Sequence, residues 1–139
     1  MTCHYGGCAC GGVSIKAYNK PKWVGHCHCP ACRQHTGSAF TTYAGYERCN
    51  VFLSGEHLKS YSGQPNVTRY FCGQCGASLA YSSSAWPEEI HLHVAVMEKP
   101  EDFKPMAHAY TRARVSWAKT ADDLYEYEDF PDYPENADV

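Results

Sequence analysis

The stretch Cys27-His28-Cys29-Pro30-Ala31-Cys32 places three cysteines within six residues. Two further clusters follow the same style, Cys8-Ala9-Cys10 and Cys72-Gly73-Gln74-Cys75. Seven of the nine cysteines therefore lie in three tight groups. An odd number of cysteines and the absence of an export signal argue against a disulfide framework. The pattern favours metal binding instead, with zinc as the expected metal and an iron–sulfur cluster as the alternative.

Two of the clusters together provide the four thiolates that a closed, tetrahedral zinc site requires. These four ligands are Cys8, Cys10, Cys72 and Cys75. Cysteines two positions apart share one face of an extended strand, so we expect a strand to present the first pair. Gly73 and Gly76 ease the turn that carries the second pair. Such a site contributes folding free energy directly, and we expect it to be structural.

The remaining cluster supplies only three ligands, Cys27, Cys29 and Cys32. Three protein ligands with an open fourth position are typical of a catalytic zinc. A fourth ligand that would close the site could come from Cys49, His26, His28 or His35. A zinc ion bound by three thiolates is a weak Lewis acid and suits a fourth sulfur. We therefore expect the open position to bind a substrate thiol rather than to activate water.

The rest of the chain predicts a mainly β domain of short strands with few helices. Pro30 suits the first position of a helix capped by Cys29, and Gly37 suits its end, so a helix is expected over residues 30–36. A second short helix is expected over residues 121–125. Strands are expected over residues 13–18, 23–24, 40–46, 51–53, 59–61, 68–71, 79–81 and 90–96.

Length and charge indicate one compact domain with an acidic end. The chain has 139 residues and a net charge of −3. Residues 1–120 hold all 12 Lys and Arg and 7 Asp and Glu, whereas residues 121–139 hold 8 acidic and no basic residues. We divide the chain into a zinc-binding domain over residues 1–131 and an acidic tail over residues 132–139. The weakly basic body predicts no nucleic-acid partner.

Membrane and export segments are not apparent in this sequence. The longest purely apolar run is a few residues, which excludes a spanning helix. The first residues show no basic segment followed by an apolar stretch. We therefore expect a cytoplasmic protein without a membrane partner.

Several other side chains have two readings. Arg69 could pair with a substrate carboxylate or with an acidic side chain of the protein. His91 and His93 share the polar face of an alternating strand and are expected to be exposed or to line a cavity. Trp86 and Trp117 are expected to anchor the core or a loop.

In its cysteine motifs and the residues around them, the chain resembles the glutathione-dependent formaldehyde-activating enzyme family, also called the centromere protein V/Gfa domain. The resemblance extends from about Tyr5 to Pro131. The motifs that carry it are Gly7-Cys8-Ala9-Cys10-Gly11-Gly12-Val13, Cys27-His28-Cys29-Pro30-Ala31-Cys32-Arg33 and Arg69-Tyr70-Phe71-Cys72-Gly73-Gln74-Cys75-Gly76.

The resemblance implies an Mss4-like small β-sheet fold with zinc knuckles and one or two short helices. It implies two Zn²⁺ ions, one structural on Cys8, Cys10, Cys72 and Cys75, and one catalytic on Cys27, Cys29 and Cys32. The implied activity is that of a carbon–sulfur lyase, which joins glutathione and formaldehyde in S-hydroxymethylglutathione. We expect a small thiol and a small aldehyde as substrates, with Arg33 and Arg69 binding the thiol.

Two other classes of protein are compatible with the cysteine clusters. A non-catalytic zinc module that binds protein or nucleic acid predicts a second site closed by a fourth protein ligand. A type B methionine sulfoxide reductase would use Cys49 as its reactive thiol. In that class the thiol should follow the last zinc pair, whereas Cys49 precedes Cys72.

Overall fold

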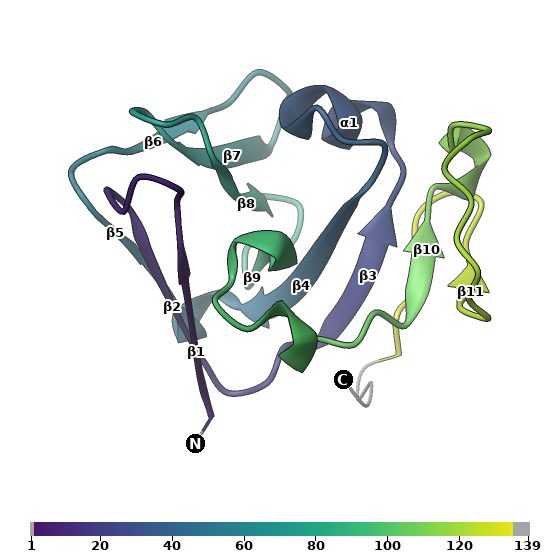
Figure 1. The fold of residues 1–139 in the computed structure, drawn as a ribbon, viewed down its shortest axis with the longest axis horizontal. Coiled ribbons are helices and arrows are strands. Elements are labelled where there is room, and N and C mark those ends of the chain that lie inside the picture. The colour runs from purple at the N-terminus through teal and green to yellow at the C-terminus, as the bar shows by residue number, and fades with distance from the viewer. Residues whose placement is uncertain (1, 135–139) are drawn as a thin grey trace.

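The computed structural model describes residues 2–134, which form a small and a large β-sheet (Figure 1). The small sheet has the strand order β1-β2-β5 and the large one β11-β10-β3-β4-β9-β8-β7-β6. The strands are β1 (Cys3–Gly7), β2 (Ser14–Tyr18), β3 (Trp23–Cys27), β4 (Thr41–Glu47), β5 (Val51–Ser54), β6 (Leu58–Tyr61), β7 (Val67–Cys72), β8 (Ser78–Ser83), β9 (Glu89–His93), β10 (Ala107–Ala109) and β11 (Tyr125–Glu126). The helix is α1 (Pro30–Thr36), and the 3-10 turns are η1 (Arg48–Asn50), η2 (Val94–Val96), η3 (Pro100–Asp102) and η4 (Thr111–Ala113).

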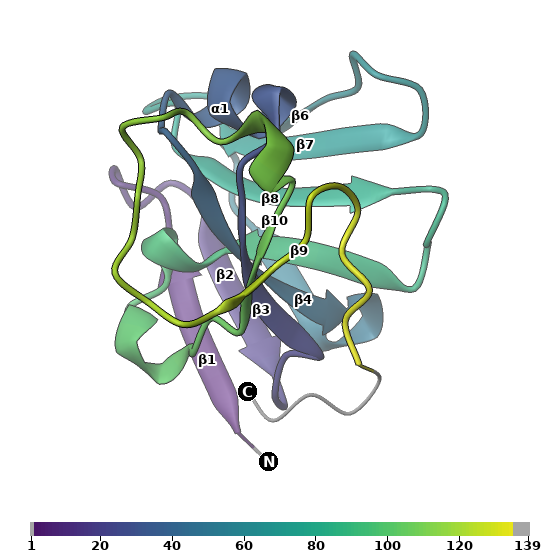
Figure 2. The same cartoon turned by 90° about the vertical axis from the view of Figure 1, so that its right-hand side faces the viewer.

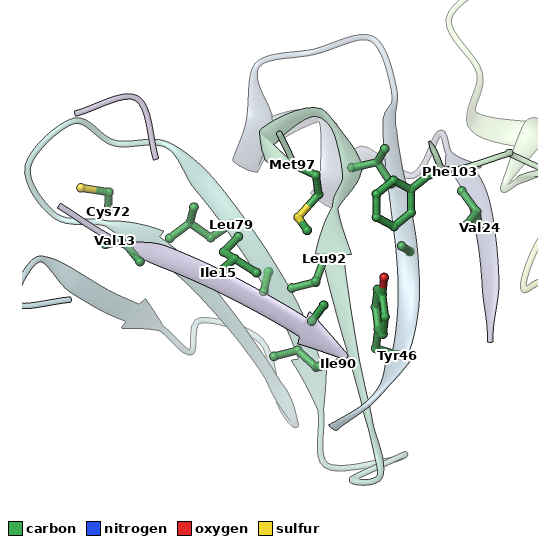
Figure 3. Close-up of a cluster of buried hydrophobic side chains, with 14 residues drawn as sticks. Val13, Ile15, Val24, Tyr46, Cys72, Leu79, Ile90, Leu92, Met97 and Phe103 are labelled. Carbon is green, nitrogen blue, oxygen red and sulfur yellow. The ribbon is translucent and has the colours of Figure 1, made fainter. Parts of the chain in front are cut away.

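The hydrophobic core lies between the two sheets. In β2 the buried residues Ile15 and Ala17 alternate with exposed positions, so one face of the small sheet is apolar. This face packs on apolar side chains of the large sheet, among them Leu79 and Leu92 (Figure 3). Cys72 belongs to the same buried cluster, which places one corner of the first cysteine group at the edge of the core.

The opposite face of the large sheet carries the side chains that matter for function. Val24 of β3 and Ala44 of β4 belong to the core cluster. Because side chains alternate along a strand, their neighbours Trp23, Gly25 and Tyr43 point to the other face. The register pairs Gly25 with Tyr43, which confirms that these residues share that face.

The predicted helix over residues 30–36 is confirmed at both ends. Cys29 is the N-cap residue, and its side chain accepts a hydrogen bond from the backbone N–H of Cys32. Pro30 occupies the first turn, where its missing N–H is no loss. Gly37 ends the helix with a positive φ of 69°, a conformation that favours glycine.

Several predicted elements differ in the structure. The helix expected over residues 121–125 is wrong, since Tyr125–Glu126 form strand β11, parallel to β10. The strand expected over residues 90–96 ends at His93 and continues as the turn η2. The N-terminal strand was expected to carry Cys8 and Cys10, but β1 ends at Gly7, where its pairing with β2 also ends. In each case pairing with a distant segment decided the local structure.

No helix in residues 2–134 is long and apolar enough to cross a membrane. The expected acidic tail over residues 132–139 lies mostly outside the described residues. Within its described part, residues 132–134, the ring of Tyr133 stacks on Trp23 of β3.

Replacing Leu92 with alanine tests the core between the sheets. Leu92 is fully buried on β9, where it pairs with Ala44 and Ala80 of the flanking strands. The Leu92→Ala variant should lose about 2–5 kcal/mol of unfolding free energy, because it leaves a cavity in a packed core. The Phe52→Ala control removes a side chain that is 55% exposed and should cost less than about 1 kcal/mol. Urea denaturation measures both, and equal losses would contradict this core assignment.

Candidate functional site

The first cysteine group converges as the spacing predicts. The four thiols of Cys8, Cys10, Cys72 and Cys75 all lie within 4.8 Å of one another. The Sγ atom of Cys10 lies 3.6 Å from the Sγ atoms of both Cys8 and Cys72. A tetrahedral zinc with bonds of about 2.3 Å separates neighbouring sulfurs by about 3.8 Å. The donor set and its spacing therefore fit a four-thiolate zinc.

A turn presents Cys8 and Cys10, whereas Cys72 is the last residue of β7 and Cys75 lies in the turn that follows. Cys8 and Cys10 follow the end of β1 in a turn, which corrects the expectation of an extended strand. The turn is closed by hydrogen bonds from the N–H of Cys8 to the carbonyl of Val13 and from the N–H of Gly11 to the carbonyl of Cys8. On the other side Gly76 adopts a positive φ of 81° and donates its N–H to the carbonyl of Cys72. Backbone N–H groups of Val13 and Cys75 also point at sulfurs, as thiolate ligands require.

The second group joins the end of β3 to the start of α1. The Sγ atom of Cys32 lies 3.0 Å from that of Cys29 and 3.5 Å from that of Cys27. Contacts with the Cys27 and Cys32 thiols lower the pKa of the Cys29 thiol to about 2, and the N–H of Cys32 and the charge of Arg69 act in the same direction. This environment favours a thiolate, the form that binds a metal.

Three thiols, rather than four, form the second group. Among residues 2–134, no other His, Cys, Asp or Glu side chain has a ligand atom within 4.8 Å of all three thiols. The four candidates for a fourth ligand have other surroundings. Cys49 is exposed on η1, His35 is exposed on α1, His26 bonds Thr42, and the buried His28 bonds His108. The donor set thus fits a zinc ion with one position left for a ligand from outside the protein.

A cavity of about 680 Å³ opens beside this second group. Cys27, Cys29 and Cys32 all line it, as does the non-core face of the large sheet. The cavity also takes in His91 of β9, as expected for a cavity-lining position, whereas His93 is buried and bonds Thr41. A volume of this size is typical of small-molecule sites.

Tyr43 and Arg69 are the polar groups beside the sulfurs. The Oη atom of Tyr43 lies 3.5 Å from the Sγ atom of Cys32, and Nη1 of Arg69 donates to that Oη at 3.4 Å. Arg69 is only 7% exposed, and its guanidinium lies over the ring of Tyr81 at 5.1 Å. Burial raises the pKa of the Tyr43 hydroxyl, so that it remains protonated. A cation and a hydroxyl donor therefore face the sulfur end of the cavity.

The structure places the two expected substrate-binding arginines differently. Arg69 lines the cavity, whereas Arg33 is absent from the described lining. Nη1 of Arg33 donates to the backbone carbonyls of His28 and Ala113 at 2.9 and 2.7 Å. This pair of bonds holds the cysteine loop against the segment that follows β10.

A buried histidine pair supports the loop that carries Cys27 and Cys29. Nε2 of His28 and Nδ1 of His108 are 2.9 Å apart, and Nε2 of His108 is 3.1 Å from a carboxylate oxygen of Asp122. His28 and His108 are almost completely buried. The sequence indicated His28 only as a possible ligand, because its partner is 80 residues away.

The far end of the cavity is aromatic, which the sequence did not reveal. Trp86 was expected to be an anchor, but it lines the cavity together with Trp23, Phe130 and Tyr133. Trp117 anchors neither core nor loop, since it is 77% exposed. The stacking of Tyr133 on Trp23 of β3, which helps to form this end, has no local sequence signal.

Comparison with known proteins places these features in a family. A family model described as glutathione-dependent formaldehyde-activating enzyme matches residues 3–113, which contain all seven clustered cysteines. An uncharacterized lyase of Schizosaccharomyces pombe is 27% identical over 77 residues, which are 55% of this chain and 56% of that protein. The match thus spans about half the length of this curated relative.

A solved structure is similar in sequence and fold. The crystal structure of a Rhodobacter sphaeroides protein is 28% identical, has a TM-score of 0.58, and covers 70% of this chain and 93% of its own. The family model matches far more than half of the chain, and the cysteine groups lie within the match. The chain therefore belongs to the family of glutathione-dependent formaldehyde-activating enzymes.

Proposed function

We propose that this protein is a zinc-dependent carbon–sulfur lyase that adds a small thiol, such as glutathione, to a small aldehyde, such as formaldehyde. Cys8, Cys10, Cys72 and Cys75 would hold a structural zinc, and Cys27, Cys29 and Cys32 a catalytic one. The family description supports the choice of glutathione and formaldehyde, and the name of the Schizosaccharomyces pombe relative supports a lyase.

One observation carries this proposal: the three-thiol group forms part of a cavity wall. All three of its cysteines line a space large enough for a substrate, and the described residues supply no fourth ligand to the group. The four-thiol group, by contrast, has a complete ligand set. The difference between the groups supports one structural and one catalytic role.

A zinc ion on Cys27, Cys29 and Cys32 would supply a soft position at which a substrate thiol loses its proton. Around that position, the charge of Arg69 offsets the net negative charge that three thiolates leave on a divalent ion. Arg69 and Tyr43 then face the reacting groups, and the hydroxyl of Tyr43 is suited to hydrogen-bond the carbonyl oxygen.

The addition balances without an oxidant or reductant. The sulfur–carbon bond forms while the carbonyl π bond opens, and the proton lost by the thiol ends on the former carbonyl oxygen. The cavity holds both reactants beside each other, and such proximity supplies much of the acceleration in an addition of two small molecules.

A non-catalytic zinc module remains the competing function. It requires no cavity at the second group and predicts no turnover with any thiol and aldehyde. The cavity beside Cys27 and Cys32 favours the enzyme.

Exchanging one cysteine in each group separates the two roles. The Cys29→Ser variant should retain about one zinc per chain, keep its fold and lose activity, because only the cavity site is damaged. The Cys75→Ser variant should lose the metal that joins two distant turns and unfold at a lower temperature. Zinc content by mass spectrometry and thermal unfolding by circular dichroism provide the readouts. Equal destabilisation of both variants would contradict the division of roles.

Replacing Arg69 tests its role toward the thiol substrate. The Arg69→Met variant should lower kcat/KM for glutathione ten- to a hundredfold, because hydrogen bonds to charged groups contribute about 1.5–3 kcal/mol. The loss should be smaller with 2-mercaptoethanol, which has no carboxylate. The Arg48→Met variant is the matched control, since Arg48 is exposed and bonds Tyr70 outside the described cavity lining. Equal losses with both thiols would contradict carboxylate binding by Arg69 and leave only its role beside the reacting atoms.

A further inference from the structure

The outer wall of the cavity comes from a part of the chain beyond the family match. That match ends at residue 113, yet Phe130, Asp132 and Tyr133 line the cavity. These residues belong to the C-terminal segment, residues 127–134, which is yellow in Figure 2. The segment is tied back to the domain by N–H groups of Tyr110, Thr111 and Arg112, which donate to its carbonyls. The cavity is thus partly lined by residues that lie outside the family match.

Two ring contacts fix the C-terminal segment on the sheet. The rings of Tyr133 and Trp23 are stacked, with centroids 4.6 Å apart and planes 6° from parallel. Phe130 packs on Trp86 with centroids 5.4 Å apart. Gly25 makes room for Tyr133, because a Cβ atom at this position would collide with the Tyr133 hydroxyl. Because Gly25 has no side chain, the ring of Tyr133 fits on the sheet and forms an aromatic wall beside Cys27.

The half of the cavity that lies away from the sulfurs, called the aromatic half, is also lined by rings from the sheet. The ring of His91 stacks on that of Tyr81 at 5.2 Å with the planes 23° apart, and it is nearly parallel to that of Trp86, 10° apart, at 6.4 Å. Trp23 meets His91 edge to face at 4.6 Å. Flat side chains thus line the far half from several directions, and this arrangement favours a planar apolar group.

The charged side chains of the aromatic half do not favour an anionic ligand there. Its charged side chains within the described lining are Lys22, Glu89 and Asp132, so one positive charge faces two negative ones. Lys22 is already paired with Glu89 at 3.2 Å and with Glu47 at 3.5 Å. Bonds from His91, Trp23 and Lys22 lower the pKa of Glu89 to about 2, so that it stays ionised. Arg69, at the sulfur end, is the described cation available to a carboxylate.

The cavity is also longer than a one-carbon aldehyde requires. Trp23 precedes Cys27 by four residues on β3, a distance of about 13 Å along an extended strand. Formaldehyde would occupy only the sulfur end, next to Tyr43 and Arg69. The aromatic half would then not contact the aldehyde.

We propose that the aromatic half of the cavity is a ring-binding subsite, and that the aldehyde substrate of this protein carries an aromatic ring. The inference rests on the proposed addition of a thiol to an aldehyde, and the bonds made and broken are the same. The thiol sulfur and its polar groups occupy the end with Cys27, Cys29, Cys32 and Arg69, while the ring on the aldehyde lies among Trp23, Trp86 and Tyr133.

Binding of an unreactive alcohol tests the subsite without any turnover. The zinc-loaded full chain is titrated with 3-phenylpropan-1-ol, and the indole N–H signals are followed by NMR. The signals of Trp23 and Trp86 should shift and that of the exposed Trp117 should not. The dissociation constant should be at least tenfold lower than for 1-hexanol. Equal binding of the two alcohols, or no shift of Trp23 and Trp86, would overturn the subsite.

Three variants locate the ring. Tyr133→Ala and Phe130→Ala should each raise the dissociation constant of 3-phenylpropan-1-ol about tenfold, and the exposed Phe130 can be changed with little risk to folding. Tyr125→Ala is the matched control, since Tyr125 is 66% exposed in the same part of the chain and lies outside the described lining. A loss in Tyr125→Ala as large as in the other two would overturn the assignment.

Turnover then tests the substrate class. With glutathione, kcat/KM for 3-phenylpropanal should exceed that for formaldehyde at least tenfold, and Tyr133→Ala should reduce this ratio toward one. A formaldehyde value equal to or above that of 3-phenylpropanal would overturn the ring-bearing substrate. Ring binding without turnover of either aldehyde would overturn the proposed lyase activity and the substrate class, but support the subsite.

Discussion

The thiols of Cys8, Cys10, Cys72 and Cys75 come from distant parts of the chain and lie within 4.8 Å of one another. This constraint fixes how the two sheets are placed. The turn after β1 and the turn after β7 are joined only if β2 packs across the large sheet, because β2 carries the first turn into place. Cys72 lies in the core cluster, so the sulfur group and the hydrophobic core share an edge. Metal affinity and core packing would therefore favour the same arrangement of sheets.

With one face of the large sheet committed to this core, the other face is free to serve a ligand. Strand alternation places core residues such as Val24 and Leu92 on one side, and Trp23, Tyr43 and His91 on the other. Two glycines leave space for aromatic rings on this second face. A Cβ atom at Gly45 would collide with the indole of Trp23, and one at Gly25 with Tyr133. The rings can lie flat on the sheet because these positions have no side chain.

Two side chains, His28 and Arg33, hold the cysteine loop at the cavity in place. His28 is buried and its ring bonds His108, while Arg33 bonds the carbonyl of His28 in the loop and that of Ala113 in η4. These contacts keep the backbone around Cys27 and Cys29 in place without occupying the cavity. A rigid support of this kind leaves the sulfur side that faces the cavity accessible to a substrate.

The sequence by itself determined the features that depend on short spacings. The three cysteine clusters in the sequence, the helix Pro30–Thr36 and most strands follow from residues within a few positions of one another, where local geometry decides. The role of Trp86, the strand at Tyr125, the turn that presents Cys8 and the histidine partner of His28 were decided by the tertiary structure alone. Each depends on a contact between segments far apart in the chain, and such a contact is stabilised by burial and strand pairing that no local pattern records.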